Sequence, residues 1–416
     1  MTSSSPTENS LRWAPWWVLA FVALWPLHGP AELVLSLGAL ATLAVLAMSR
    51  FRGGMSLLSH EAWALTSVLF CAYWVPELVS SIDAVDAGRA LRESLVDLRY
   101  LPFLWLVAMA VADERGRRLT FGGIAVIASL WVADGLVQAT TGWSVGGPAT
   151  ADRLSGVFGA ENLKLGLVLA SLAPFPLAAA SQRFGLVGWL LMAAALVVVV
   201  LLAGARASWL TLGLVLVFSG WRLLGSKRAM LVLGLGGALL FALSMTLSDK
   251  LQERVERTEA ALNGGTEGLD HALSGRLPIW QAAWNMALAH PVNGVGVRGF
   301  RQAYPEHAVE GDPWLQDAEH GAGYHAHQIV LEVLSETGLI GLLLWLGGVA
   351  LAWRAWRFAT SEARARAHAP ALALMVTVFP LNTHLAFYST FWGGLTLLLA
   401  ALYAGSLLAA PTRAAG

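Results

Sequence analysis

The sequence predicts an all-α polytopic integral membrane protein, and its composition gives two reasons for this prediction. Hydrophobic residues make up 56% of the 416 positions and charged residues only 13%, whereas roughly a quarter of the residues in a soluble domain are charged. The mean hydropathy is +0.61, and the chain contains 19 Trp, a residue favoured where the lipid headgroups begin. These properties exclude an ordinary soluble domain.

Long apolar runs are the third observation that predicts this fold class. A bilayer core requires roughly 20 mostly apolar residues per helix, and about twelve runs approach that length. Only two residues separate the last two runs, so the expected number of spans is eleven or twelve. The runs lie near residues 13–28, 31–48, 61–79, 99–112, 119–140, 161–181, 185–203, 207–223, 228–246, 328–353, 369–387 and 390–409.

Lys and Arg in the short loops predict the orientation, because cytoplasmic loops carry more of them. With the N-terminus in the cytoplasm, the inward loops hold Arg50, Arg52, Arg115, Arg117, Arg118, Arg183, Arg222, Lys227, Arg228, Arg354, Arg357, Arg364 and Arg366. The opposite short loops hold fewer, namely Arg89, Arg92, Arg99, Arg153, Lys164 and Arg206. We therefore expect both termini in the cytoplasm. Residues 1–10 are polar and carry no Lys or Arg, so we expect no cleavable signal peptide.

The spans predict three parts of the chain. Residues 1–247 would hold about nine transmembrane helices, residues 248–327 one long extracytoplasmic segment, and residues 328–416 two or three further helices. Within the long segment, Trp280, Trp284 and Leu288 share one helical face, which is typical of a helix lying on or just above the membrane. The prolines and glycines that follow from Pro291 onward indicate a loop.

Two arginines on the extracytoplasmic side run against the orientation rule. Arg206 lies at the outer junction of two apolar spans among small residues, and Arg276 begins the amphipathic stretch. A charged group in or near the hydrocarbon is costly and is therefore a functional-site candidate. The alternatives are that Arg206 extends its side chain to the interface and that Arg276 is an ordinary solvated residue at a helix start.

Four further cations belong to the same side of the membrane. Arg298 and Arg301 either face solvent or take part in substrate entry. Arg153 and Lys164 flank a turn before a span, where Ser155 and its neighbouring glycines can present backbone N–H groups to an anion at a helix start. A plain loop is the alternative for that turn.

A histidine pair, His325 and His327, stands at the beginning of the next span. A histidine suits an acid–base role or a phosphate contact, because its pKa lies near working pH. A metal site is the weaker reading, since no carboxylate cluster at ligand spacing lies beside the pair, although Glu319 and His320 are close in sequence. Glu336 follows on the span and is expected to pair with an arginine inside the bundle. The single cysteine excludes a cysteine-based metal site.

Several arginines and two histidines thus gather on one side of the membrane. The planar guanidinium group binds phosphate bidentately and stays charged, so a pyrophosphate is the expected ligand. The sequence lacks a phosphate-binding P-loop and an Asp-x-Asp pair for a metal-bound nucleotide sugar, so the donor should be a lipid-linked sugar. The net charge of +0 gives no reason to expect a nucleic-acid partner.

Four local patterns, in this order and topology, resemble the O-antigen ligase and polymerase superfamily of the Wzy-C type. The first pattern comprises Arg153, Ser155, Gly156, Phe158 and Asn162, and the second is Arg206 in GARASWL. The third comprises Arg276, Trp280, Pro291, Gly294, Gly296 and Phe300. The fourth comprises His327, Glu336, Gly338 and Gly341, with Gln328 where Asn is common. Gly204 and Ala205 replace the common serine of the second pattern.

The resemblance implies an O-antigen ligase of the bacterial inner membrane with its active site facing the periplasm. The donor would be O-antigen on undecaprenyl pyrophosphate, and the acceptor a sugar hydroxyl of lipid A–core. Arg206 and Arg276 would clamp the pyrophosphate, and His327 would be the general base with His325 as its substitute. Other substrate contacts are expected from Arg153, Lys164, Arg298, Arg301 and Glu336. Transfer would invert the anomeric centre without a metal or other cofactor.

Other functions remain open on the sequence alone. Within the superfamily they are an O-antigen polymerase, whose acceptor is a second lipid-linked chain, and a protein O-oligosaccharyltransferase. A lipid or polysaccharide transporter would instead show an inverted repeat and ionisable residues near the membrane midplane, and the sequence shows neither. The roles of Arg89 and Arg92 are not determined by the sequence.

Overall fold

The predicted fold class is confirmed by a computed structural model of the chain. It describes residues 12–27, 29–51, 58–149, 153–160, 162–225, 275–316, 325–382 and 386–409, with isolated positions between 227 and 234. Regular structure in these residues is helical apart from one antiparallel hairpin, β1 (Trp143–Ser144) with β2 (Gly147–Pro148). The predicted span at 228–246 and the charge-dense start of the long segment lie outside the described residues.

Seven of the described helices are long and apolar enough to cross a membrane. They are α3 (Pro30–Phe51), α4 (His60–Ser80), α7 (Glu114–Thr141), α9 (Pro174–Leu202), α10 (Arg206–Leu224), α17 (Ile329–Phe358) and α20 (Thr390–Leu407). Three predicted spans form helices of only 10 or 11 residues, which are too short to cross alone. These are α2 (Ala14–Ala23), α6 (Tyr100–Ala110) and α19 (His368–Thr377). The expected count of about twelve is therefore not confirmed.

The predicted spans at 161–181 and 185–203 do not coincide with single helices. The first begins as α8 (Leu165–Leu172), which runs on at Pro174 into α9. The backbone of α9 is non-helical at Gly185, with φ 62° and ψ −144°, so this helix consists of two parts. The boundary that the sequence placed near residue 185 thus corresponds to a real break.

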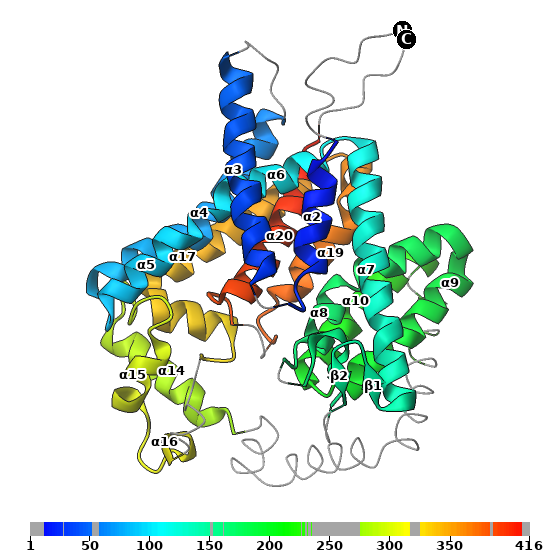
Figure 1. The fold of residues 1–416 in the computed structure, drawn as a ribbon. Helices are drawn as coiled ribbons and strands as arrows, with labels where there is room; N and C mark the ends of the chain where they lie inside the picture. Colours follow the sequence, from blue (N-terminus) through cyan, green and yellow to red (C-terminus); the bar gives the residue numbers. More distant parts are fainter. Residues whose placement is uncertain are drawn as a thin grey trace.

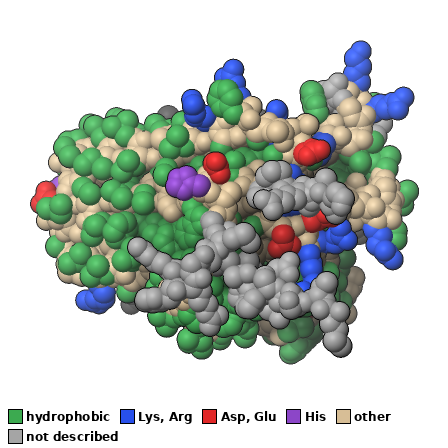
Figure 2. Space-filling view, turned by 90° about the horizontal axis from the view of Figure 1, so that it is seen from above, with side chains coloured by type: hydrophobic (Ala, Val, Ile, Leu, Met, Phe, Trp, Pro, Cys, Tyr) green, Lys and Arg blue, Asp and Glu red, His purple; other side chains and the backbone are tan. Residues whose placement is uncertain are grey.

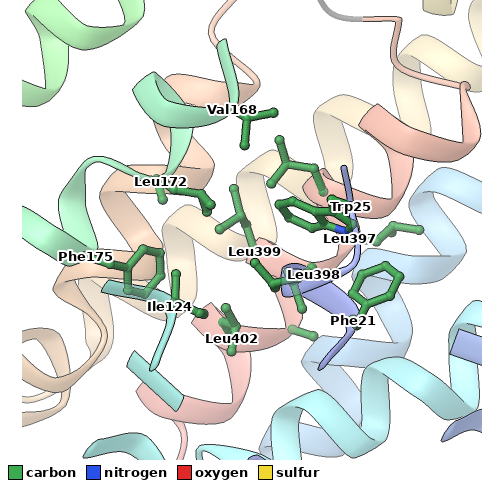
Figure 3. Close-up of a cluster of buried hydrophobic side chains, with 14 of the residues drawn as sticks. Phe21, Trp25, Ile124, Val168, Leu172, Phe175, Leu397, Leu398, Leu399 and Leu402 are labelled. Carbon is green, nitrogen blue, oxygen red and sulfur yellow. The ribbon is translucent and has the colours of Figure 1, made fainter. Parts of the chain in front are cut away.

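The C-terminal helix α20 forms the centre of the hydrophobic core. Leu397, Leu398 and Leu402 of α20 face apolar side chains from several other helices, including Phe21 of α2 and Phe175 of α9 (Figure 3). Because α20 is apolar all round rather than along one stripe, either other helices or lipid must cover its whole circumference. Other parts of the protein provide most of this cover, since 83% of the helix is buried.

The described helices of the long segment between α10 and α17 gather at one end of the bundle, below α5 (Ala87–Asp97) and α17 in Figure 1. They are α14 (Leu277–Ala289), α15 (Phe300–His307) and α16 (Pro313–Gln316). Ile279 and Met286 of α14 pack against Phe300 of α15 in a small core of their own. The β1–β2 hairpin projects from the same end (Figure 1), which we call the α14 end.

The opposite face of α14 is apolar and exposed. Trp284 is 46% exposed and Leu288 is 65% exposed, as the amphipathic pattern predicts for a helix lying at a membrane surface. The molecule seen from the end opposite to α14 shows Lys and Arg side chains around its periphery (Figure 2). Helix α7 begins at that opposite end with Arg115, Arg117 and Arg118.

Candidate functional site

The site at the α14 end depends on a break in α17. At Gly338 the backbone has φ 62° and ψ −162°, so an initial helical part, residues 329–337, precedes the long remainder. Backbone N–H and C=O groups near such a break lose their helical partners and need others when they are buried. The loop at residues 291–296 supplies these partners.

Four backbone hydrogen bonds join that loop to the break. Leu339 and Ile340 donate to the carbonyl oxygens of Pro291 and Val292, at 2.9 and 3.1 Å. In the other direction, Val295 donates to Ser335 and Gly296 to Glu336, at 2.9 and 3.0 Å. The two segments thus pair like short strands, although they are about 40 residues apart in the chain.

Glycine is required where the two segments touch. Gly294 and Gly338 both have positive φ, +69° and +62°, a conformation that residues with a Cβ atom rarely adopt. A Cβ atom on Gly338 would overlap the carbonyl group of Val292, and one on Gly294 would overlap the backbone of Glu336. This contact gives a physical reason for glycine in the third and fourth sequence patterns.

Arg298 follows the loop and is held from three sides. Its guanidinium group forms ion pairs with Glu93 and Asp97 of α5, and its Nε donates to the carbonyl oxygen of Tyr388 at 2.7 Å. Its own backbone is in the left-handed region, with φ 56°. With 18% of the side chain exposed, Arg298 is not solvent-facing, which corrects one of the two sequence readings.

Glu336 contacts Arg298 in a different way from the expected ion pair. Its Oε2 accepts a hydrogen bond from the backbone N–H of Arg298 at 2.7 Å. The guanidinium group of Arg298 instead pairs with the α5 carboxylates, which the sequence analysis did not connect with it. Glu336 therefore fixes the backbone of the loop.

The charges around Arg298 and Asp97 shift their pKa values. Burial alone would lower the pKa of Arg298, but the neighbouring Tyr73, Asp97 and Glu93 raise it overall. Burial raises the pKa of Asp97 to about 6, although Arg298 acts in the opposite direction. Arg298 is thus a cation stabilised by carboxylates from a helix about 200 residues earlier.

A polar cavity of about 530 Å³ opens beside this network. Its lining comes from α5, α15, the first part of α17 and the turn before α20, and comprises Arg89, Arg298, Arg301, Gln302, His325, Glu332, Glu336, Ala386, Tyr388, Ser389 and Thr390. Arg301, predicted as a substrate contact, is exposed and lines the cavity. Arg89 lines it as well, whereas Arg92 is exposed and is not part of the lining.

The histidine pair lies at the edge of this cavity. His325 lines it, and the ring centroids of His325 and His327 are 3.9 Å apart. His327 has a positive φ of 52°, an uncommon conformation for a residue other than glycine. Gln328 caps α17, because its side chain accepts from the N–H of Leu331 at 2.6 Å, and it also donates to the carbonyl oxygen of Pro380.

A second group of cations forms where α10 and α14 begin. Arg206 is the first residue of α10, and Arg276 precedes the first residue of α14. Burial lowers the pKa of Arg276, and the positive charges of Arg206 and Arg153 lower it further. The structure therefore brings these three predicted residues close enough for their charges to interact. We call them the arginine cluster.

The turn between Arg153 and Lys164 differs from the predicted anion site. The N–H groups of Ser155 and Gly156 donate to Oε1 of Gln138, at 3.0 and 2.8 Å, so they are not directed at a ligand. Lys164 lies 4.2 Å from the ring centroid of Phe391, an arrangement typical of a cation–π contact. Burial lowers its pKa.

An apolar cavity of about 780 Å³ lies in the bundle among α4, α10, α17, α19 and α20. Tyr73 and Phe387, whose ring centroids are 5.1 Å apart, form part of its wall. Phe387 also contacts Tyr388 of the polar cavity, with 5.0 Å between ring centroids. The two cavities therefore adjoin at these aromatic residues.

Metal-binding groups of three or more His, Cys, Asp or Glu are absent from the described residues. Glu319 and His320, the other members of the weak metal reading, lie outside the described part of the chain. The expectation of a metal-independent site stays a prediction.

Comparison with known proteins supports the family resemblance. Residues 190–346 match the family model for O-antigen ligase, Wzy_C, a family of glycosyltransferase-like polysaccharide ligases and polymerases. The match includes α10, α14, α15 and the first part of α17, and so Arg206, Arg276 and His327. It confirms over this segment the resemblance expected from the sequence.

A curated relative is similar over a shorter stretch. The exopolysaccharide production protein ExoQ of Rhizobium meliloti (strain 1021) is 34% identical over 82 residues. These residues cover 19% of this chain and 18% of the relative. The chain thus matches less than a fifth of that protein's length.

Proposed function

We propose that this protein is an O-antigen ligase that transfers O-antigen from undecaprenyl pyrophosphate to a sugar hydroxyl of lipid A–core. The observation that carries the proposal is the arginine cluster. Arg153, Arg206 and Arg276 come from three distant segments, yet the charges of Arg153 and Arg206 act on Arg276 at the start of α14. The positive charges of Arg206 and Arg153 act against that of Arg276, and an anionic ligand would relieve this repulsion.

Pyrophosphate is the anion that best suits this cluster. Guanidinium groups form bidentate hydrogen bonds with phosphate oxygens and stay charged at any working pH. Arg206 and Arg276 would hold the pyrophosphate and stabilise the negative charge that develops on it as it leaves. The apolar cavity in the bundle supports the proposal that the substrates carry lipid chains.

The proposed reaction is a single displacement at the anomeric carbon. The acceptor hydroxyl oxygen attacks the anomeric carbon, and the bond from that carbon to the pyrophosphate oxygen breaks with its electron pair on the pyrophosphate. Attack opposite the leaving group inverts the anomeric centre. The hydroxyl proton passes to a base, for which His327 with its partner His325 is our candidate. Positioning supplies much of the rate, because the leaving group is already good.

The proposed location is the bacterial inner membrane with the site facing the periplasm. The peripheral Lys and Arg side chains at the end opposite to α14 (Figure 2) support this orientation, since positive charge is favoured on the cytoplasmic side. Both termini would then be cytoplasmic. Lys164 and Arg301 remain proposed substrate contacts, whereas Arg298 and Glu336, also expected as contacts, would act on the substrate only through the loop that they hold.

An O-antigen or exopolysaccharide polymerase is the second candidate. The similarity of residues in this chain to an exopolysaccharide production protein favours it. The donor chemistry would be the same, but the acceptor would be a second lipid-linked chain.

A cellular assay tests the proposal and separates the two candidates. Arg276→Ala and His327→Ala are introduced singly into a strain that depends on this protein, membrane levels are checked, and lipopolysaccharide is compared with lipid-linked O-antigen. The ligase function is supported if lipid A–core lacks O-antigen while long undecaprenyl-linked chains accumulate. Accumulation of single repeats would identify a polymerase. Unchanged lipopolysaccharide in both variants would refute the proposed function.

A further inference from the structure

The polar cavity beside the histidine pair contains a carboxylate that the proposed chemistry does not use. Glu332 is 2% exposed and lines the cavity. One of its oxygens, Oε1, accepts a hydrogen bond from the N–H of Tyr388 at 3.2 Å. The other, Oε2, is buried and accepts no hydrogen bond of good geometry from the described residues, although the backbone N–H of Phe387 also lies near this carboxyl group. A buried carboxylate oxygen without a partner is costly, so this atom indicates a ligand.

The charges in the cavity select the kind of ligand. Arg89 and Arg301 contribute positive groups, but Glu332 and Glu336 contribute carboxylates, and Arg298 is already paired with two further carboxylates. A pyrophosphate would meet carboxylates here, whereas in the arginine cluster it meets cations. A cavity lined by both arginines and glutamates suits a ligand that both donates and accepts hydrogen bonds. The vicinal hydroxyl groups of a sugar do both.

The position of the cavity gives the sugar a role. His325 lies in its wall and contacts His327, the candidate base. A sugar in the cavity would therefore present a hydroxyl group next to the histidine pair. Its volume of about 530 Å³ is within the range of roughly 300–1,000 Å³ that is usual for small-molecule sites.

We propose that this cavity is the acceptor subsite, and that Glu332 Oε2 accepts a hydrogen bond from a hydroxyl group of the acceptor saccharide. Arg89 and Arg301 supply further hydrogen-bonding groups around the sugar. This inference rests on the proposed function. It divides the α14 end into a donor region, the arginine cluster, and an acceptor region, with the histidine pair at the edge of the latter.

The test is a kinetic comparison of donor and acceptor with purified protein in nanodiscs. The donor is undecaprenyl-pyrophosphate-linked O-antigen, and the acceptor is lipopolysaccharide that lacks O-antigen. In Glu332→Gln the amide oxygen can still accept from Tyr388, but an amide N–H replaces the acceptor atom in the cavity. We expect the acceptor KM to rise about tenfold or more, with the donor KM unchanged. Glu306→Gln, an exposed glutamate on α15, is the matched control.

The outcomes separate this inference from the proposed function. If the wild-type protein transfers O-antigen but Glu332→Gln keeps the wild-type acceptor KM, the acceptor assignment fails and the ligase remains. If Glu332→Gln raises only the donor KM, the cavity belongs to the donor and the assignment fails. If the wild type transfers nothing to lipopolysaccharide, binding of lipid-free core oligosaccharide is measured by calorimetry. Absence of that binding would overturn both proposals.

Discussion

Arg276 and Arg298 belong to the same long segment between α10 and α17, but their surroundings are opposite. Burial lowers the pKa of Arg276, and its positive neighbours Arg206 and Arg153 lower it further. Arg298 lies among carboxylates, and its pKa is raised. The comparison teaches that residue type alone does not identify a ligand-binding arginine. A cation placed among cations suits an incoming anion, whereas a cation paired with carboxylates holds the fold together.

Removing Arg298 should give the largest effect on stability. In Arg298→Ala, Glu93 and the buried Asp97 lose their common cation, and breaking such a buried pair costs about 3–5 kcal/mol. Thermal unfolding of the purified protein in detergent measures this loss. Arg92→Ala, an exposed arginine of the same helix as Glu93, is the control and should unfold like the wild type. Equal unfolding temperatures for Arg298→Ala and the wild type would contradict the structural role assigned to this residue.

A smaller loss is expected from Gly338→Ala. The methyl group would overlap the carbonyl group of Val292, and the left-handed backbone costs on the order of 1–3 kcal/mol for a residue with a side chain. The loop at 291–296 should then undock, which hydrogen exchange of the Gly296 and Leu339 amides would detect. Gly347→Ala is the matched control, because a Cβ atom there meets nothing within 4 Å.

If the arginine cluster and the polar cavity are independent regions, undocking the loop at 291–296 should leave the arginine cluster unaffected. We therefore expect Gly338→Ala to change acceptor binding more than pyrophosphate binding. The reverse pattern would mean that the break at Gly338 positions the arginine cluster as well, and the two regions would no longer be distinct.

Much of the fold was predictable because local patterns determine it. The apolar runs predicted most of the helices, and the spacing of Trp280, Trp284 and Leu288 predicted the exposed apolar face of α14. Counting spans was less successful. Runs such as 99–112 are apolar because they are buried inside the bundle, and α6 is only 11 residues long. Hydropathy does not distinguish burial in protein from burial in lipid.

The site was predictable only in part. Charge placed against the orientation rule identified Arg206 and Arg276, which the structure brings together with Arg153. The partners of Arg298 were not found, because Glu93 and Asp97 are about 200 residues away and lie on a helix that hydropathy treats as a loop. Glu332 was not singled out as a site residue from the sequence. Its buried oxygen is a property of three-dimensional packing that spacing along the chain does not reveal.

The most direct test of the contrast between the two regions is a calorimetric titration of the purified protein with inorganic pyrophosphate. The wild type is compared with Arg276→Ala and with Arg298→Lys, which keeps a cation for Glu93 and Asp97. We predict that Arg276→Ala weakens binding at least tenfold, since a charge-assisted hydrogen bond is worth about 1.5–3 kcal/mol, and that Arg298→Lys binds like the wild type. Equal affinity of Arg276→Ala and the wild type, or a loss confined to Arg298→Lys, would contradict the assignment of the donor pyrophosphate to the arginine cluster.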